Sequence, residues 1–86
     1  MNSGLDLLEQ QMRELVCRVT GLPNDFDANA HLYLDLGVAS MHALQLLTEL
    51  EQEYGIHVPD EQFVDATSLA QLTTMVRGLT TNPLQA

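Results

Sequence analysis

Apolar residues recur every three or four positions near the start of the chain, which is the period of an amphipathic helix. We expect this helix over residues 5–19, with Ser3 as its cap and Asp6 favourably placed toward the helix dipole. The segment GLP at residues 21–23 is expected to end it, because glycine caps helix C-termini and proline cannot continue a helix. The apolar positions are Leu5, Leu8, Met12, Leu15, Val16 and Val19.

A second helical pattern, from Met41 to Tyr54, is the clearest in the chain. At about 100° per residue its apolar positions fall on one side, which is expected to face the core. Glu49 and Glu53 lie beside that stripe, and Gly55 is expected to end the helix. The stripe consists of Ala43, Leu46, Leu47, Leu50 and Tyr54.

A short third helix is expected to follow a turn. Pro59 and Asp60 are suited to its first residues, and Phe63 and Val64 are expected to point inward.

The last helix is expected to begin at Ser68, with Gln71 placed to complete a capping box. After Gly78 the tail LTTNPLQA is expected to fray. The apolar positions of this helix are Leu69, Leu72, Met75, Val76 and Leu79.

A long connection, residues 24–39, joins the first two helices. Its apolar segment LYL at residues 32–34 is expected to seat the loop on the core, and a short strand is the alternative. No repeat or linker interrupts the chain. The patterns therefore predict an all-α four-helix bundle with a long first loop and a short third helix. We expect one domain over residues 1–86, with its core at 4–79 and a flexible tail at 80–86.

The charge balance narrows the range of partners. The chain has 12 acidic residues and 3 basic ones, giving a net charge of −9. Such a field repels nucleic acid and anionic lipid surfaces, and it favours either basic protein partners or simply solubility. No apolar run approaches the ~18 residues of a membrane span, and no secretory signal pattern opens the chain. We therefore expect a cytoplasmic monomer that binds neither nucleic acid nor membrane.

The reactive side chains show no arrangement typical of an enzyme. Cys17 is a single cysteine in an apolar helical context, which is typical of a core residue. Cys17 and the histidines His31, His42 and His57 lack metal-ligand spacing, so no metal is expected. His42 lies two positions after Ser40, and residues two apart on a helix do not face each other. We therefore expect no catalytic residue.

Ser40, in the stretch DLGVASMHALQL, could serve either as a helix cap or as a site of chemistry. It could cap the helix that follows. The third residue after Ser68 is Gln71, which can complete a capping box, whereas the third residue after Ser40 is Ala43, which cannot. Gly37 allows a sharp turn before Ser40, and the small residues around it favour exposure. An exposed hydroxyl at a helix N-terminus suits a phosphate ester, because free amides and the helix dipole stabilise an anion there.

Residues 29–63 resemble the acyl carrier proteins and their peptidyl-carrier relatives. The resemblance rests on an acidic-Leu-Gly turn, a serine, a Leu- and Glu-rich helix and a Pro-Asp-Glu exit, and the flanking helices fit in pattern. These parts are Asp35, Leu36, Gly37, Ser40, Glu49, Leu50, Glu51, Tyr54, Pro59, Asp60 and Glu61.

The resemblance implies a four-helix carrier that performs no catalysis. A phosphopantetheinyl transferase, using coenzyme A and magnesium, would attach 4′-phosphopantetheine covalently to Ser40. The thiol of that arm would then hold an acyl or aminoacyl group as a thioester for loading ligases, synthases and transferases.

Two features depart from the family pattern. The residue before the serine is usually Asp, and here it is Ala39. The outward face of the second helix is acidic in fatty-acid carriers, whereas here it carries His42, Gln45 and Gln52, and Glu51 alone keeps the charge. Partner contact is therefore expected to be largely apolar near Ser40. The expected partner-binding residues are Asp35, Met41, Leu44, Gln45, Thr48, Glu51, Ile56 and His57.

Three functions fit these observations. The first is a stand-alone acyl carrier protein in specialised lipid or secondary-metabolite synthesis. The second is an aminoacyl or peptidyl carrier protein, which the neutral docking face favours. The third is an unmodified helical protein-interaction module in which Ser40 only caps a helix.

Overall fold

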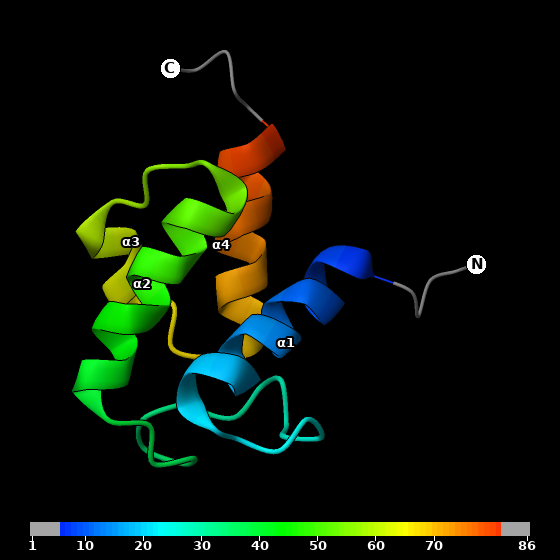
Figure 1. Cartoon of the computed structure of the whole chain (residues 1–86), viewed down its shortest axis with the longest axis vertical. Helices are drawn as coiled ribbons and strands as arrows, with labels where there is room; N and C mark the ends of the chain where they lie inside the picture. The colour runs from blue at the N-terminus through cyan, green and yellow to red at the C-terminus, as the bar shows by residue number, and fades with distance from the viewer. Residues whose placement is uncertain (1–5, 82–86) are drawn as a thin grey trace.

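The computed structural model describes residues 6–81 and contains four helices joined by loops (Figure 1). The helices are α1 (Leu7–Thr20), α2 (Ser40–Tyr54), α3 (Asp60–Asp65) and α4 (Leu69–Thr81). The described range contains no strand, which confirms the all-α bundle and rules out the alternative strand at residues 32–34. Among the described residues, no helix combines the length and the hydropathy that a membrane span requires.

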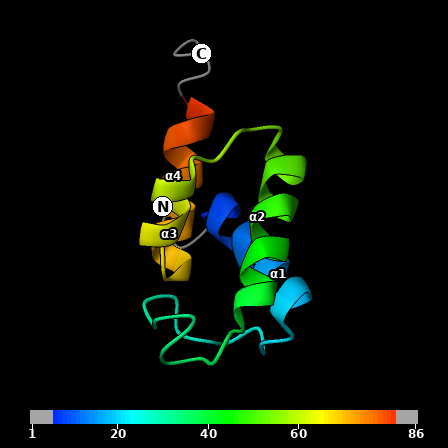
Figure 2. The same ribbon diagram turned by 90° about the vertical axis from the view of Figure 1, so that its left-hand side faces the viewer.

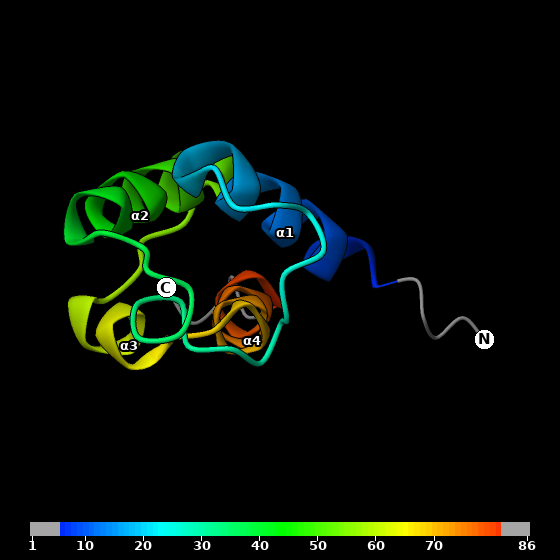
Figure 3. The same cartoon turned by 90° about the horizontal axis from the view of Figure 1, so that it is seen from below.

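Helix α1 joins the two halves of the bundle. It packs against both α4 and α2, and Figure 3 shows α1 and α2 along one side with α3 and α4 along the other. Leu46 and Leu50 of α2 are buried in the same core, and the rest of the predicted α2 stripe packs partly buried against it. The periodicity therefore predicted the inward faces of the long helices correctly. The core residues from α1 and α4 are Met12, Leu15, Val16, Val19, Leu69, Leu72 and Val76.

The start of α1 differs from the prediction. The helix begins at Leu7, because the Asp6 carboxylate accepts a hydrogen bond from the Glu9 N–H at 3.2 Å and acts as the N-cap. Ser3, the expected cap, lies outside the described residues. Gly21 and Gly55 end α1 and α2 in the left-handed conformation, as predicted.

Of the two apolar residues of α3 that were predicted to point inward, only one does. Phe63 is buried, but Val64 is 69 % exposed, so its predicted inward orientation is wrong. Neighbouring residues on a helix lie about 100° apart, and on this six-residue helix Phe63 takes the inward position while Val64 faces solvent. Ala66, three positions after Phe63, completes the buried side.

The capping of α4 follows the predicted scheme with a shift of one residue. The Ser68 hydroxyl oxygen accepts from the Gln71 N–H at 3.2 Å, as expected. The Gln71 amide oxygen, however, accepts from the Thr67 N–H at 2.9 Å and not from that of Ser68. The helix also continues past Gly78 to Thr81, so the predicted fraying does not begin at Leu79, and residues 82–86 lie outside the described range.

The long loop between α1 and α2 is held on the bundle at several points. Leu32 is fully buried, and its N–H donates to the Thr67 carbonyl at 2.8 Å. Arg13 of α1 donates to the Phe26 carbonyl at 2.6 Å and lies 4.5 Å over the Phe26 ring. The expected seating of the loop by the segment LYL therefore depends mainly on Leu32, because Leu34 is 81 % exposed.

An ion pair connects the start of α1 to α4. Arg77 lies 2.6 Å from the Asp6 carboxylate, and this hydrogen bond, followed by that from the Glu9 N–H, holds the pKa of Asp6 below its usual value. The folded state therefore holds the Asp6 carboxylate ionised to lower pH than the unfolded chain does, and the interaction stabilises the fold above the unfolded pKa of about 4.

We predict that Asp6→Asn, which keeps a capping oxygen but loses the charge, lowers the urea midpoint at neutral pH. As pH falls from about 6 to about 2, the wild-type carboxylate becomes protonated and its advantage over Asp6→Asn should shrink toward zero. Urea unfolding of both proteins across this range measures the difference. An advantage that stays constant with pH would contradict the assigned charge interaction.

Candidate functional site

Ser40 is the first residue of α2, and its side chain is exposed. The N-cap is Ala39, in an extended conformation with no side-chain capping bond. The Ala39 carbonyl accepts the N–H groups of His42 and Ala43, which starts the helix without help from any side chain. The interpretation of Ser40 as a helix cap is therefore wrong, because Ser40 already lies one position inside the helix.

The backbone before Ser40 is fixed by its loop. Gly37 has a φ of 73°, in the left-handed region that side chains with a Cβ rarely adopt. Directly after it, the Val38 N–H donates to the Leu32 carbonyl at 2.9 Å, and the Val38 side chain is buried. The chain thus turns sharply, anchors at Val38 and then presents Ala39 and Ser40 to solvent.

The first turn of α2 favours an anion. It contains no acidic residue, and no side chain caps it. The amides at a helix start lack partners within the helix, and the positive end of the helix dipole points out from them. A phosphate ester on the neighbouring hydroxyl would therefore be stabilised by about 0.3–1 kcal/mol.

An apolar groove of about 880 Å³ begins at Ser40. It lies between α2 and α3, which stand on opposite sides of the view in Figure 2. Three of its large apolar side chains, Met41, Leu44 and Val64, are about 70 % exposed, so the groove is open to solvent. The lining residues are Tyr33, Ser40, Met41, Ala43, Leu44, Leu47, Asp60, Phe63, Val64 and Thr67.

The sequence reasoning missed the half of this groove that comes from outside α2. Tyr33, Val64 and Thr67 belong to the loop, to α3 and to the α3–α4 connection. Spacing gave no decisive signal for Val64, because helix neighbours can both be buried, as Leu15 and Val16 are in α1. Tyr33 and Thr67 gave no periodic signal, because both lie in irregular segments.

Five of the eight expected partner-binding residues lie on α2, and Asp35, Ile56 and His57 lie in the connections on either side of it. Met41, Leu44, Gln45 and Thr48 are all exposed on the first half of the helix. Glu51 follows Ser40 by eleven positions, which at 1.5 Å per residue corresponds to about 16 Å along the axis. On α2, these four residues are therefore closer to the serine than Glu51 is.

The remaining expected contacts also hold the fold together. The Glu51 carboxylate accepts from the Val58 N–H at 2.9 Å and lies 3.5 Å from Nδ1 of His57, which is itself exposed. The Asp35 carboxylate accepts from the His31 N–H at 2.9 Å. Ile56 is partly buried against the core. These carboxylates therefore support turns on either side of α2.

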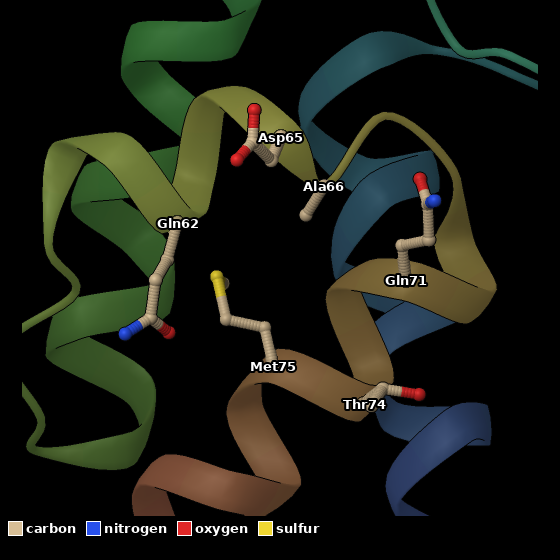
Figure 4. A pocket seen from close by; sticks show the side chains of 6 residues that line it. All are labelled: Gln62, Asp65, Ala66, Gln71, Thr74 and Met75. Atoms are coloured by element: carbon tan, nitrogen blue, oxygen red, sulfur yellow. The ribbon is translucent and has the colours of Figure 1, made fainter.

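A second pocket, of about 270 Å³, lies between α3 and α4 (Figure 4). The Met75 sulfur points into it from α4, between Gln62 and Ala66, while the Asp65 carboxylate points away. It shares no lining residue with the groove at Ser40. Within residues 6–81, no cluster of three or more His, Cys, Asp or Glu side chains is arranged to hold a metal ion.

The chain matches the family model of the phosphopantetheine attachment site over residues 10–76. The match runs from α1 to α4 and includes all of the long loop, α2 and α3. This chain belongs to the phosphopantetheine-binding carrier family. Its cofactor is covalently attached 4′-phosphopantetheine, and carriers of this family interact with phosphopantetheinyl transferases and with synthases or ligases.

The residues at the start of α2 fit this cofactor. The group is attached through a phosphate, and the uncapped first turn of α2 offers free amides and the positive dipole end. The arm beyond the phosphate is long and needs space, which the exposed position of Ser40 provides. The apolar groove begins at the same residue.

Proposed function

We propose that Ser40 carries the 4′-phosphopantetheine and that this protein is an acyl carrier protein. The observation that carries the proposal is the exposed, unengaged hydroxyl of Ser40 at the start of α2. Ser68, the other serine within residues 6–81, is only 6 % exposed and its oxygen caps α4. The described serines thus differ in the property that attachment needs, which is a hydroxyl free to react.

In this proposal the chain holds and presents cargo without making or breaking bonds itself. The bound group supplies a thiol that carries cargo as a thioester. The α2 amides stabilise the phosphate, and the loop turn at Gly37 keeps the attachment point exposed. His42 is the nearest histidine in sequence, but it lies about 200° around the helix from Ser40, so it is not placed to act as a base on the hydroxyl.

The groove beside Ser40 supports acyl cargo. Seven of its ten lining residues are apolar or aromatic, and Asp60, Thr67 and Ser40 are the polar ones. An alkyl chain laid along Leu44, Leu47 and Phe63 would lose contact with water, which is favourable by about 25 cal/mol per Å². A charged aminoacyl group would gain no such benefit.

An aminoacyl or peptidyl carrier is the second candidate. The observation in its favour is the neutral outer face of α2, where Met41, Leu44, Gln45 and Thr48 are exposed. If the cargo is acyl, this neutral face favours a role in specialised lipid or secondary-metabolite synthesis. Carriers of bulk fatty-acid synthesis commonly present acidic residues on the same face.

We predict that the chain gains the mass of one phosphopantetheinyl group when co-expressed with a broad-specificity phosphopantetheinyl transferase. Ser40→Ala should remove this gain completely. Ser68→Ala is the matched control and should keep it, because its hydroxyl is buried. Intact-mass spectrometry measures all three. An unmodified wild type with several transferases would favour a simple interaction module, and a gain retained in Ser40→Ala would overturn the site.

Partner docking is proposed to combine apolar contact on α2 with charge on α3. Met41 and Leu44 are 72 % and 69 % exposed beside Ser40, and the first turn of α3 carries Asp60 and Glu61. Buried apolar contacts set complex lifetime, whereas charges at the rim mainly steer the encounter. The affinity for partners should therefore depend more on the α2 side chains than on salt.

We predict that Met41→Ala or Leu44→Ala raises the KM of the transferase for this chain about tenfold. Leu7→Ala is the control, because Leu7 is equally exposed, at 67 %, but lies at the start of α1. Loading kinetics at several salt concentrations measure both effects. Binding that collapses in moderate salt yet ignores the α2 substitutions would contradict an apolar docking face.

A further inference from the structure

The turn at residues 31–36 is built around a single residue, His31, through both its main chain and its side chain. Its ring Nδ1 accepts hydrogen bonds from the Tyr33 N–H at 3.2 Å and the Leu34 N–H at 3.0 Å. Its carbonyl accepts from the N–H groups of Asp35 and Leu36, and its own N–H donates to the Asp35 carboxylate. These five hydrogen bonds converge on one residue of an otherwise irregular loop.

Histidine is an unusual choice for this task. Side chains that accept hydrogen bonds from backbone amides in tight turns are mostly Asp, Asn, Ser and Thr. An imidazole can do the same only through an unprotonated nitrogen, because a protonated one is a donor. The geometry at His31 therefore requires Nδ1 to be the acceptor and places the ring proton on Nε2.

This turn leads directly to the groove and to Ser40. The Tyr33 ring packs edge-on against the His31 ring, with centroids 5.8 Å apart, and Tyr33 lines the groove. On the other side of the turn, the Leu32 carbonyl accepts from Val38, two residues before Ser40. Figure 3 shows the loop passing across the end of the bundle from which α2 starts. His31 itself is not among the groove-lining residues.

We propose that His31 is a positioning residue for phosphopantetheine attachment. By accepting the amide protons of Tyr33 and Leu34, its Nδ1 fixes the groove wall and the backbone that leads into α2. It thereby sets how the transferase approaches Ser40. This inference rests on the proposed attachment at Ser40, and His31 acts on that reaction only through the turn.

Two substitutions test whether the role of His31 depends on a hydrogen-bond acceptor at the place of Nδ1. An asparagine side chain brings its amide oxygen to the place of Nδ1, whereas a glutamine amide reaches the place of Nε2. His31→Asn should therefore keep both turn hydrogen bonds, and His31→Gln should lose them. Amide hydrogen exchange at Tyr33 and Leu34, followed by NMR, reads the hydrogen bonds directly, and a thermal melt confirms that each variant is folded.

The kinetic test is transfer of phosphopantetheine from coenzyme A by one transferase. The expected result is a kcat/KM about tenfold lower for His31→Gln and within about twofold of wild type for His31→Asn. The final extent of loading should be complete in both, because Ser40 is retained. Amide exchange at Tyr33 and Leu34 should be fast in His31→Gln alone.

Two results would overturn the inference. If His31→Gln loads as fast as wild type, the turn does not position the serine. If His31→Asn and His31→Gln are slowed equally, the Nδ1 acceptor is not what matters. Failure of the proposed function is distinguishable from both, since wild type and all variants would then remain unloaded after long incubation.

Discussion

The position of Ser40 depends on how the long loop is seated, and the central contact is that of Leu32. Its side chain is fully buried and its N–H donates to the Thr67 carbonyl just before α4. The Leu32 carbonyl in turn accepts from Val38, where the chain turns toward α2. Ordering a connection of this length costs conformational entropy, which the burial of Leu32 and these hydrogen bonds offset. One buried residue therefore links the core to the proposed attachment point at Ser40.

The helix starts of α2 and α4 use serine in different ways. Ser68 stabilises α4 through its oxygen, which accepts from Gln71. Helix α2 begins without a side-chain cap, which forgoes about 1 kcal/mol that a capping residue would supply. The family's usual Asp before the serine is replaced by Ala39, so no carboxylate occupies the amides there. This arrangement leaves the start of α2 without a side-chain cap, as the proposed attachment at Ser40 requires.

Much of the fold follows from periodicity, because a helix repeats its inward face over several turns. The stripes of α2 and α4 and the glycine stops at Gly21 and Gly55 were predictable for this reason. Short or irregular segments lack such repetition. Val64 and Leu34 were expected inside but are exposed, and the shift from Ser3 to Asp6 depends on one local hydrogen bond.

The candidate site, like the fold, could be predicted only in part from the sequence. Ser40 could be singled out, because a serine before a strong helical pattern within a family-like turn is a local signal. The opposite wall of the groove could not, since Tyr33 and Thr67 reach it through loop geometry. The acceptor role of His31 was equally hidden, because no spacing rule connects an imidazole to the amides of Tyr33 and Leu34.

The central claim is that the fold leaves the Ser40 hydroxyl free, and the unfolding free energies of two unmodified serine variants test it most directly. Ser68→Ala should cost about 1 kcal/mol, because it removes a capping oxygen. Ser40→Ala should cost less than about 0.5 kcal/mol, as expected for an exposed residue without a structural partner. A loss for Ser40→Ala as large as that for Ser68→Ala would contradict the account.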